Sequence, residues 1–115
     1  MAASEGEIQK WILLELQKVD GVKVWRQNAG ALRDRNGRLV RYGIPGWADI
    51  SGIAAPEGWR IELEVKRPGE RLSDRQCKWR RMIEAVGGIY LVAHSPEEAF
   101  RLLTLELCKR RTKTA

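Results

Sequence analysis

The stretch IELEVK, residues 61–66, decides the fold prediction because apolar and charged residues alternate through it without a break. Successive side chains of a β-strand point to opposite faces of the strand. The apolar residues are therefore expected on one face, and Glu62, Glu64 and Lys66 on the other. We predict a strand over residues 59–66 whose apolar face joins the core and whose second face carries two acids and a lysine.

Helix starts flank this strand on both sides. A serine followed three residues later by glutamate or glutamine forms a capping box, and two such boxes predict helices over residues 4–21 and 73–86. Ser95-Pro96 opens a third helix, with proline at the first helical position. The chain is expected to end in a frayed basic tail at residues 109–115.

The remaining elements are predicted strands. Asn36-Gly37 is typical of a tight turn and predicts a small hairpin. Further strands are expected at residues 22–28, 49–54 and 89–93. The order α-β-(hairpin)-β-β-α-β-α predicts an α/β fold in one domain, residues 1–115, with a mixed β-sheet flanked by helices.

Length and composition exclude several classes of protein. The 115 residues suffice for one domain, and the apolar runs are too short to span a membrane. The N-terminus lacks the basic-then-apolar pattern of a secretory signal. Two cysteines and one histidine do not resemble a disulfide framework, a four-ligand zinc site without carboxylates or a four-thiolate iron–sulfur site. We expect no membrane partner and an intracellular location, in the cytoplasm of a bacterial host or an equivalent DNA-containing compartment.

The charge balance indicates a polyanionic partner. Lys and Arg number 21 against 15 Asp and Glu, a formal net charge of +6. Most of the basic residues are arginines, whose planar fork suits phosphate oxygens. Nucleic acid is the simplest such partner. Charge alone leaves a basic protein without any such partner equally open.

Asp49 and Glu64 are candidate metal ligands. If the strands over residues 49–54 and 59–66 pair as a hairpin, the two carboxylates can converge. Two carboxylates and a main-chain carbonyl suit Mg²⁺ or Mn²⁺. Lys66 lies about 6.6 Å from Glu64 along the strand, which leaves room for a hydrated ion. The alternatives are a turn aspartate and an ordinary solvated strand face.

Taken in order, these features resemble the PD-(D/E)xK nuclease superfamily, and most closely its VRR-NUC family. The resemblance covers residues 5 to 100 and rests on the order and spacing of several motifs. These are a Gly/Pro-rich lead-in to an aspartate (43–49), E-x-K at a strand end (64–66), a glycine-containing loop (69–73), a helix that opens with Gln76 and carries Trp79, and a double glycine before a hydrophobic strand (87–93). One departure is that Pro45 lies four residues before Asp49 and not directly before it.

The resemblance implies a PD-(D/E)xK restriction-endonuclease-like core and a set of site residues. Asp49 and Glu64, with the carbonyl of Val65, would bind the metal, and Lys66 would orient the attacking water. Glu62 shares their face, as a spare ligand or a solvated charge, and we favour the solvated charge.

Two further residues carry two interpretations each. The resemblance implies that Gln76 helps to organise the site or a phosphate, and that Glu7 is a further metal ligand. Local chemistry makes each of them a helix cap within its capping box. For Gln76 both roles are compatible, and for Glu7 we favour the cap.

Three basic clusters border the proposed site and are interpreted as a phosphate track. Their residues are Arg33, Arg35, Arg38 and Arg41 in the hairpin, Arg67 and Arg71 after the E-x-K strand, and Arg75 and Lys78 on the following helix. Trp11 and Trp79 are expected in the core. Trp47 is expected to pack there too, unless it walls the site or stacks on a base.

The sequence therefore predicts a Mg²⁺- or Mn²⁺-dependent, structure-selective DNA endonuclease. Small stand-alone proteins of this kind resemble Holliday-junction resolvases, which implies branched DNA as substrate and a homodimer that cuts two strands. The alternatives are a flap, fork or restriction-type nuclease on the same scaffold, and a non-catalytic nucleic-acid-binding module.

Overall fold

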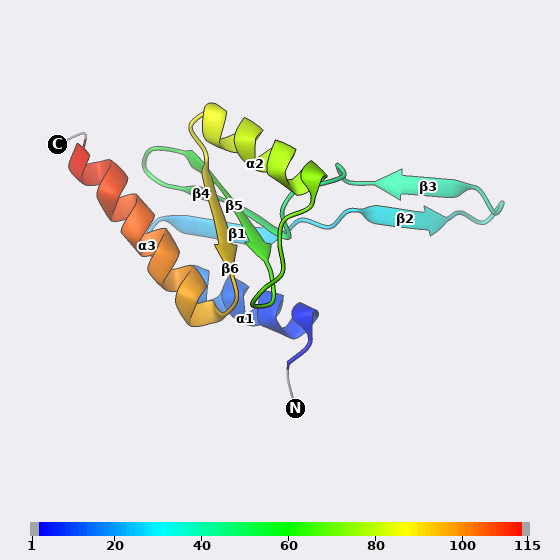
Figure 1. Ribbon diagram of the computed structural model, residues 1–115, viewed down its shortest axis with the longest axis horizontal. Coiled ribbons are helices and arrows are strands. Elements are labelled where there is room, and N and C mark those ends of the chain that lie inside the picture. Colours follow the sequence, from blue (N-terminus) through cyan, green and yellow to red (C-terminus); the bar gives the residue numbers. More distant parts are fainter. Residues whose placement is uncertain (1–2, 114–115) are drawn as a thin grey trace.

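A computed structural model describes residues 3–113, and within this range the predicted order of helices and strands is confirmed (Figure 1). The elements are α1 (Glu5–Leu16), β1 (Val22–Arg26), β2 (Gly30–Arg33), β3 (Leu39–Tyr42), β4 (Ile50–Ala54), β5 (Trp59–Val65), α2 (Asp74–Ala85), β6 (Ile89–Ala93) and α3 (Pro96–Lys113).

The main sheet is mixed, as predicted, with strand order β1-β4-β5-β6. β1, β4 and β5 are antiparallel neighbours, whereas β6 lies parallel to β5. Residues 55–58 join β4 to β5 directly, and the β2–β3 hairpin is inserted between β1 and β4. Parallel neighbours need a crossover, and α2 supplies it between β5 and β6. β5 is thus a central strand with a neighbour on each side.

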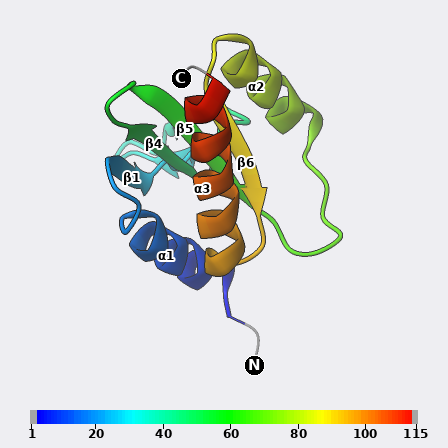
Figure 2. The same cartoon turned by 90° about the vertical axis from the view of Figure 1, so that its left-hand side faces the viewer.

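Helices cover both faces of the sheet. α1 and α3 pack together over one face and enclose the main core, to which β5 contributes Ile61, Leu63 and Val65 (Figure 2). α2 lies on the opposite side, where a smaller cluster forms around Ile83 and Tyr90. The face of β5 that carries the acids therefore points toward α2.

β2 and β3 form the predicted hairpin as a separate two-stranded sheet that projects from the rest of the molecule (Figure 1). The turn is stabilised by Asp34, whose carboxylate accepts hydrogen bonds from the main-chain N–H groups of Asn36 and Arg38, each at 2.9 Å. Gly37 adopts a positive φ of 79° there, which only glycine does without strain. All eight strand residues of the hairpin are exposed.

Two helix ends differ from the prediction. α1 ends at Leu16, not near residue 20, because Lys18 and Val19 donate to carbonyls three residues back, which tightens the chain before it turns at Gly21. Residues 109–113 are not a frayed tail but the last turns of α3. Arg110 anchors them by donating to the carbonyls of Gly87 and Gly88, at 2.7 and 3.0 Å. Residues 114–115 lie outside the described range.

The prediction that Trp11 lies in the core is wrong, because its side chain is 44% exposed on the outer side of α1. Trp79 lies on α2 and is partly buried against the face of the sheet that α2 covers. Among residues 3–113, no helix combines the length and apolarity needed to cross a membrane.

Candidate active site

The two predicted metal-binding acids face each other across the β4–β5 ladder. The register pairs Ile50 with Leu63 and Ser51 with Glu62, so the next position pairs Asp49 with Glu64. Directly opposed residues of antiparallel strands have Cβ atoms about 5 Å apart. The Asp49 carboxylate accepts a hydrogen bond from the main-chain N–H of Val65 at 2.8 Å, which fixes its place beside Glu64. The hairpin pairing on which convergence depended is present.

The Glu64 carboxyl is buried and only partly satisfied. Burial, followed by the negative charge of Asp49, raises the pKa of Glu64 to about 9, against a smaller lowering effect of Lys66. Its Oε2 atom is buried with no hydrogen-bond partner among the described residues. An unsatisfied carboxylate oxygen beside a second carboxylate is unfavourable unless a cation neutralises the pair.

This donor set fits a hard divalent cation. Asp49 and Glu64 offer carboxylate oxygens, and Val65 between Glu64 and Lys66 offers a main-chain carbonyl. Oxygen-only donors of this kind are those that Mg²⁺ and Mn²⁺ take, with water completing the coordination. The unpartnered Oε2 of Glu64 is the observation that a bound cation would explain.

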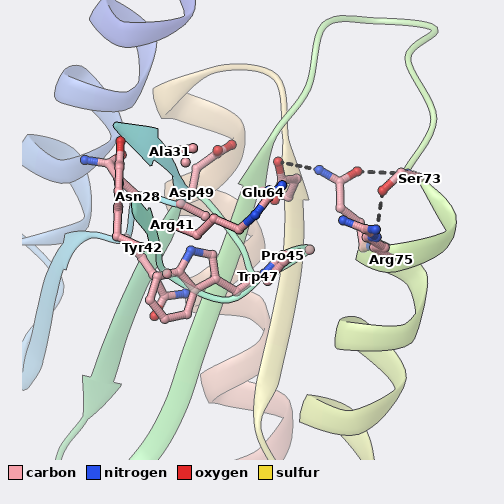
Figure 3. A pocket seen from close by; sticks show the side chains of 16 residues that line it. Asn28, Ala31, Arg41, Tyr42, Pro45, Trp47, Asp49, Glu64, Ser73 and Arg75 are labelled. Atoms are coloured by element: carbon pink, nitrogen blue, oxygen red, sulfur yellow. Dashed lines mark hydrogen bonds between the residues drawn. The ribbon is translucent and has the colours of Figure 1, made fainter. Parts of the chain in front are cut away.

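Gln76 makes the contacts of both of its predicted roles (Figure 3). Its main-chain N–H donates to Ser73 Oγ at 3.2 Å and its Oε1 accepts from the Ser73 N–H at 2.8 Å, which completes the capping box of α2. Its Nε2 donates to Glu64 Oε1 at 3.1 Å. The Gln76 side chain therefore caps the start of α2 with its Oε1 and orients Glu64 with its Nε2.

Lys66 follows β5 and is held through its main chain. Its N–H donates to the carbonyl of Ala93 at 3.1 Å, and its carbonyl contacts His94 Nδ1 at 2.6 Å. A carbonyl only accepts, so Nδ1 carries the proton in this contact. The carboxylate of Glu98 accepts from the His94 main-chain N–H at 2.7 Å and holds this histidine in turn. Sequence reasoning gave His94 no role, since the contact joins residues 28 positions apart.

Lys66 lies apart from the main cleft. It lines a smaller cavity of about 230 Å³ with Glu5 and His94, whereas Asp49 and Glu64 line a cleft of about 700 Å³. Its charge nevertheless lowers the pKa of Glu64. Lys66 therefore does not line the cleft that contains the acids, but it is close enough for its charge to act on Glu64.

The cleft runs between the base of the hairpin and the start of α2 (Figure 3). Its outer wall is the Gly/Pro-rich lead-in, residues 43–47, which packs closely on both sides. A Cβ on Gly43 would lie 2.6 Å from the Asn28 carbonyl oxygen, and one on Gly46 would lie 2.7 Å from that of Arg75. Both glycines also have positive φ, of 74° and 91°. The motif thus needs glycine to bring this loop against α2.

The predicted basic residues divide into three groups. Arg41 and Arg75 line the acid-containing cleft, and Arg67 lines the smaller cavity. Arg33, Arg35 and Arg38 are exposed farther out on the hairpin, and Arg71 and Lys78 are exposed outside both cavities. Trp47 lines the cleft half-buried and packs edge-on against Trp79, with ring centroids 6.4 Å apart.

Glu7 makes the contacts of the helix cap that we favoured for it. Its main-chain N–H donates to Ser4 Oγ at 3.2 Å, and its carboxylate contacts the same hydroxyl at 3.2 Å, on the exposed start of α1. Within residues 3–113, no three acidic, histidine or cysteine side chains gather into a group that could hold a metal. The cap that we favoured for Glu7 is therefore present, and the metal role that the resemblance implies for it stays a prediction.

The interpretation of Glu62 as a solvated charge is wrong. Its side chain is fully buried, and its carboxylate accepts from Trp79 Nε1 at 2.6 Å, Gln27 Nε2 at 3.0 Å and Arg60 Nε at 3.3 Å. Alternation places Glu62 on the correct face but does not show that α2 covers it. We call these four residues the buried network: Glu62, Gln27, Arg60 and Trp79. Sequence reasoning missed Gln27 and Arg60 altogether.

Comparison with known proteins supports the fold. A solved structure described as a "VRR_NUC domain" superposes with a TM-score of 0.61 over 90% of this chain and 97% of its own, at 22% sequence identity. No family model matches the chain, and no curated protein matches it. The chain thus has the fold of a VRR_NUC domain, and the predicted fold class is confirmed.

Proposed function

We propose that this protein is a metal-dependent, structure-selective DNA endonuclease. The observation that carries the proposal is the opposed pair of acids, Asp49 and Glu64, in which a buried oxygen of Glu64 lacks a partner among the described residues. The VRR_NUC fold, whose printed name refers to a nuclease, supports the same conclusion.

The site residues divide the work between them. Asp49, Glu64 and the carbonyl of Val65 would hold Mg²⁺ or Mn²⁺, which lowers the pKa of a bound water and neutralises charge on phosphate oxygens. Lys66 orients the attacking water and offsets negative charge that develops in the transition state. Gln76 holds Glu64 Oε1 and leaves Oε2 for the cation.

DNA binding is assigned to the basic residues around the cleft. Arg41 and Arg75 line the cleft that contains the acids, which supports a role in contacting phosphates next to the scissile bond. The remaining set, Arg33, Arg35, Arg38, Arg67, Arg71 and Lys78, would contact the flanking backbone. Such contacts position the nucleic acid without reading its sequence.

The substrate that we propose is a four-way junction, cut by a homodimer. The exposed hairpin supports the dimer, because Leu32, Leu39 and Val40 are 64%, 50% and 48% exposed on it. Isolated two-stranded hairpins are marginally stable in water, and exposed apolar groups often mark interfaces. A two-fold dimer would present two acid pairs to two strands.

The test is cleavage of labelled four-way, flap, fork and linear duplex DNA with Mg²⁺, Mn²⁺ or EDTA, with Lys66→Ala in parallel. Paired symmetric nicks in the junction that require metal and vanish in the variant are expected. Cleavage of another substrate alone would replace the junction and keep the nuclease. Tight, salt-sensitive binding without cleavage of any substrate would favour the non-catalytic module. Light scattering that shows a monomer at micromolar concentration would contradict the paired cut.

A further inference from the structure

Glu62 is a fully buried carboxylate that the proposed chemistry does not use. It lies two residues before Glu64, on the same face of β5, and accepts hydrogen bonds from Trp79, Gln27 and Arg60. Trp79 belongs to α2, and Gln27 directly follows β1. A buried carboxylate is costly unless it is fully hydrogen-bonded. Two of the donors come from other parts of the chain and Arg60 from β5 itself, so Glu62 joins α2 and the segment after β1 to β5 at one point.

Gln27 connects Glu62 to the main chain around Asp49. Its N–H donates to the Asp49 carbonyl at 2.8 Å, and its side-chain Nε2 donates to the Ala48 carbonyl at 3.3 Å. The same Nε2 donates to Glu62 Oε1 at 3.0 Å, while its Oε1 accepts from Arg60 at 3.1 Å. Two acceptors at one end of the amide and a donor at the other permit a single orientation. Gln27 therefore holds two consecutive carbonyls, the second of them that of Asp49.

We propose that Glu62 and Gln27 are positioning residues that hold the Asp49 carboxylate opposite Glu64 and thereby set the affinity of the acid pair for a divalent cation. The cation part rests on the proposed function, whereas the placement of Asp49 is a property of the metal-free protein. Neither residue touches the reacting atoms. Their effect passes through the main chain at residues 48–49.

The substitution Glu62→Gln tests the contact between Glu62 and Gln27 with almost no change in side-chain volume. The Oε1 of the new amide can still accept from Trp79 and Gln27, but its NH₂ replaces Oε2. There it meets Arg60 Nε and, in the longer 3.3 Å contact, Gln27 Nε2, which are both donors. If Gln27 turns its amide to relieve this conflict, it presents oxygen to the Ala48 carbonyl and loses that bond. Gln27→Met removes the same contacts while keeping the length of the side chain. Both variants should therefore loosen the segment that carries Asp49 at the Ala48 carbonyl, while the main-chain bond from Gln27 to the Asp49 carbonyl remains.

The first measurement is calorimetric titration of the full chain with Mn²⁺ alone. Loss of groups that orient metal ligands weakens binding about 10- to 100-fold, and this is the expected change for each variant. The double variant should bind no more weakly than the weaker single variant, because both substitutions break one connection. Ser51→Ala is the matched control. Ser51 is buried directly opposite Glu62, its hydroxyl has no hydrogen-bond partner among the described residues, and its loss should leave Mn²⁺ affinity unchanged.

The second measurement uses the metal-free protein. The Val65 amide donates to Asp49 Oδ2, so its proton NMR shift and its hydrogen-exchange protection report where the Asp49 carboxylate lies. Asp49→Ala supplies the reference for loss of this bond. In Glu62→Gln and Gln27→Met the Val65 signal should move toward that reference, whereas in Ser51→Ala it should not. Where Glu62→Gln does not fold, Gln27→Met alone decides.

The outcomes separate this proposal from the one on which it partly rests. A Val65 amide unchanged in a folded Gln27→Met variant would overturn the positioning role, whatever the metal does. Mn²⁺ binding that is unaffected in variants whose only change is a lower Tm would also overturn it, by assigning the network to stability alone. Equal Mn²⁺ binding by wild type and Asp49→Ala would instead refute the proposed metal site. A shifted Val65 amide would still support the placement of Asp49.

Discussion

Glu62 and Glu64 are two residues apart on one face of one strand, and both are buried, yet their surroundings differ. Glu62 accepts hydrogen bonds from three side chains and has its charge fully enclosed. Glu64 has one donor, Gln76, a second carboxylate beside it and an unpartnered oxygen. The comparison shows that the role of a buried acid follows from whether its hydrogen bonds are satisfied, and not from burial alone. A fully hydrogen-bonded carboxylate stabilises the structure, whereas one with an unsatisfied oxygen is free to bind a ligand.

The largest expected effect is on catalysis, and it concerns the acid pair and Lys66. Asp49→Ala, Glu64→Ala and Lys66→Ala should each reduce cleavage about 1000-fold or more, because each removes a group that acts on charge in the transition state. Single-turnover cleavage of the preferred DNA in Mg²⁺ measures this, with filter binding in EDTA to show that affinity for DNA is retained. Cleavage like that of wild type by any one variant would remove its residue from the mechanism.

The second prediction concerns stability and differs between the two acids. Glu62→Gln should destabilise the protein by about 1–3 kcal/mol, because donors then face donors in the buried network. Glu64→Gln keeps the bond to Gln76 in one amide orientation and removes a carboxyl that cannot ionise favourably, so it should not destabilise the metal-free protein. Urea unfolding of both variants in EDTA tests the pair. Equal losses would mean that the two environments do not differ as described.

The pH dependence of stability sharpens the same contrast. Because the pKa of Glu64 is raised from 4.5 to about 9, the folded metal-free protein holds this proton more tightly than the unfolded chain. The resulting contribution is fully present below pH 4.5 and is lost as pH rises to about 9. The Tm in EDTA should therefore fall with pH more in wild type than in Glu64→Gln. Identical pH profiles would contradict the perturbed carboxyl.

A smaller effect is expected at His94, which holds the carbonyl of Lys66. Asparagine can place its amide N–H near the position of Nδ1, so His94→Asn should keep the contact, whereas His94→Leu should lose it. We expect a decrease in the single-turnover rate of about tenfold for leucine, with little change for asparagine, because a small displacement of Lys66 suffices. Equal rates in both variants would show that the contact does not position Lys66.

The smallest effect is expected for an arginine outside both acid environments. Arg38→Ala, at the hairpin turn, should weaken DNA binding by a few-fold and reduce the slope of log affinity against log salt by about 1. Arg41→Ala should give the same salt effect and also slow cleavage, because Arg41 lines the cleft. Binding titrations at several salt concentrations, with cleavage rates at saturation, separate these roles. Neither change should alter stability in the metal-free protein.

Local patterns predicted much of this architecture. The capping box of α2, the turn at Asn36-Gly37 and the limits of β6 follow from neighbouring residues, and the structure has all three. The burial of Glu62, the exposure of Trp11 and the role of Arg110 in anchoring the end of α3 could not be predicted this way. Each depends on which distant element covers a residue, and strand alternation or helical spacing carries no information about that.

The sequence by itself determined that residues 61–66 alternate, that Glu62, Glu64 and Lys66 share a face, and that Asp49 could meet Glu64 in a hairpin. These consequences follow from local geometry, because a strand turns alternate residues to the same side. Only the tertiary structure decided that α2 would bury this face and that Gln27 and Trp79 would satisfy Glu62. The physical reason is that hydrogen bonds and burial are settled by the atoms that pack against a side chain, and those come from elsewhere in the chain.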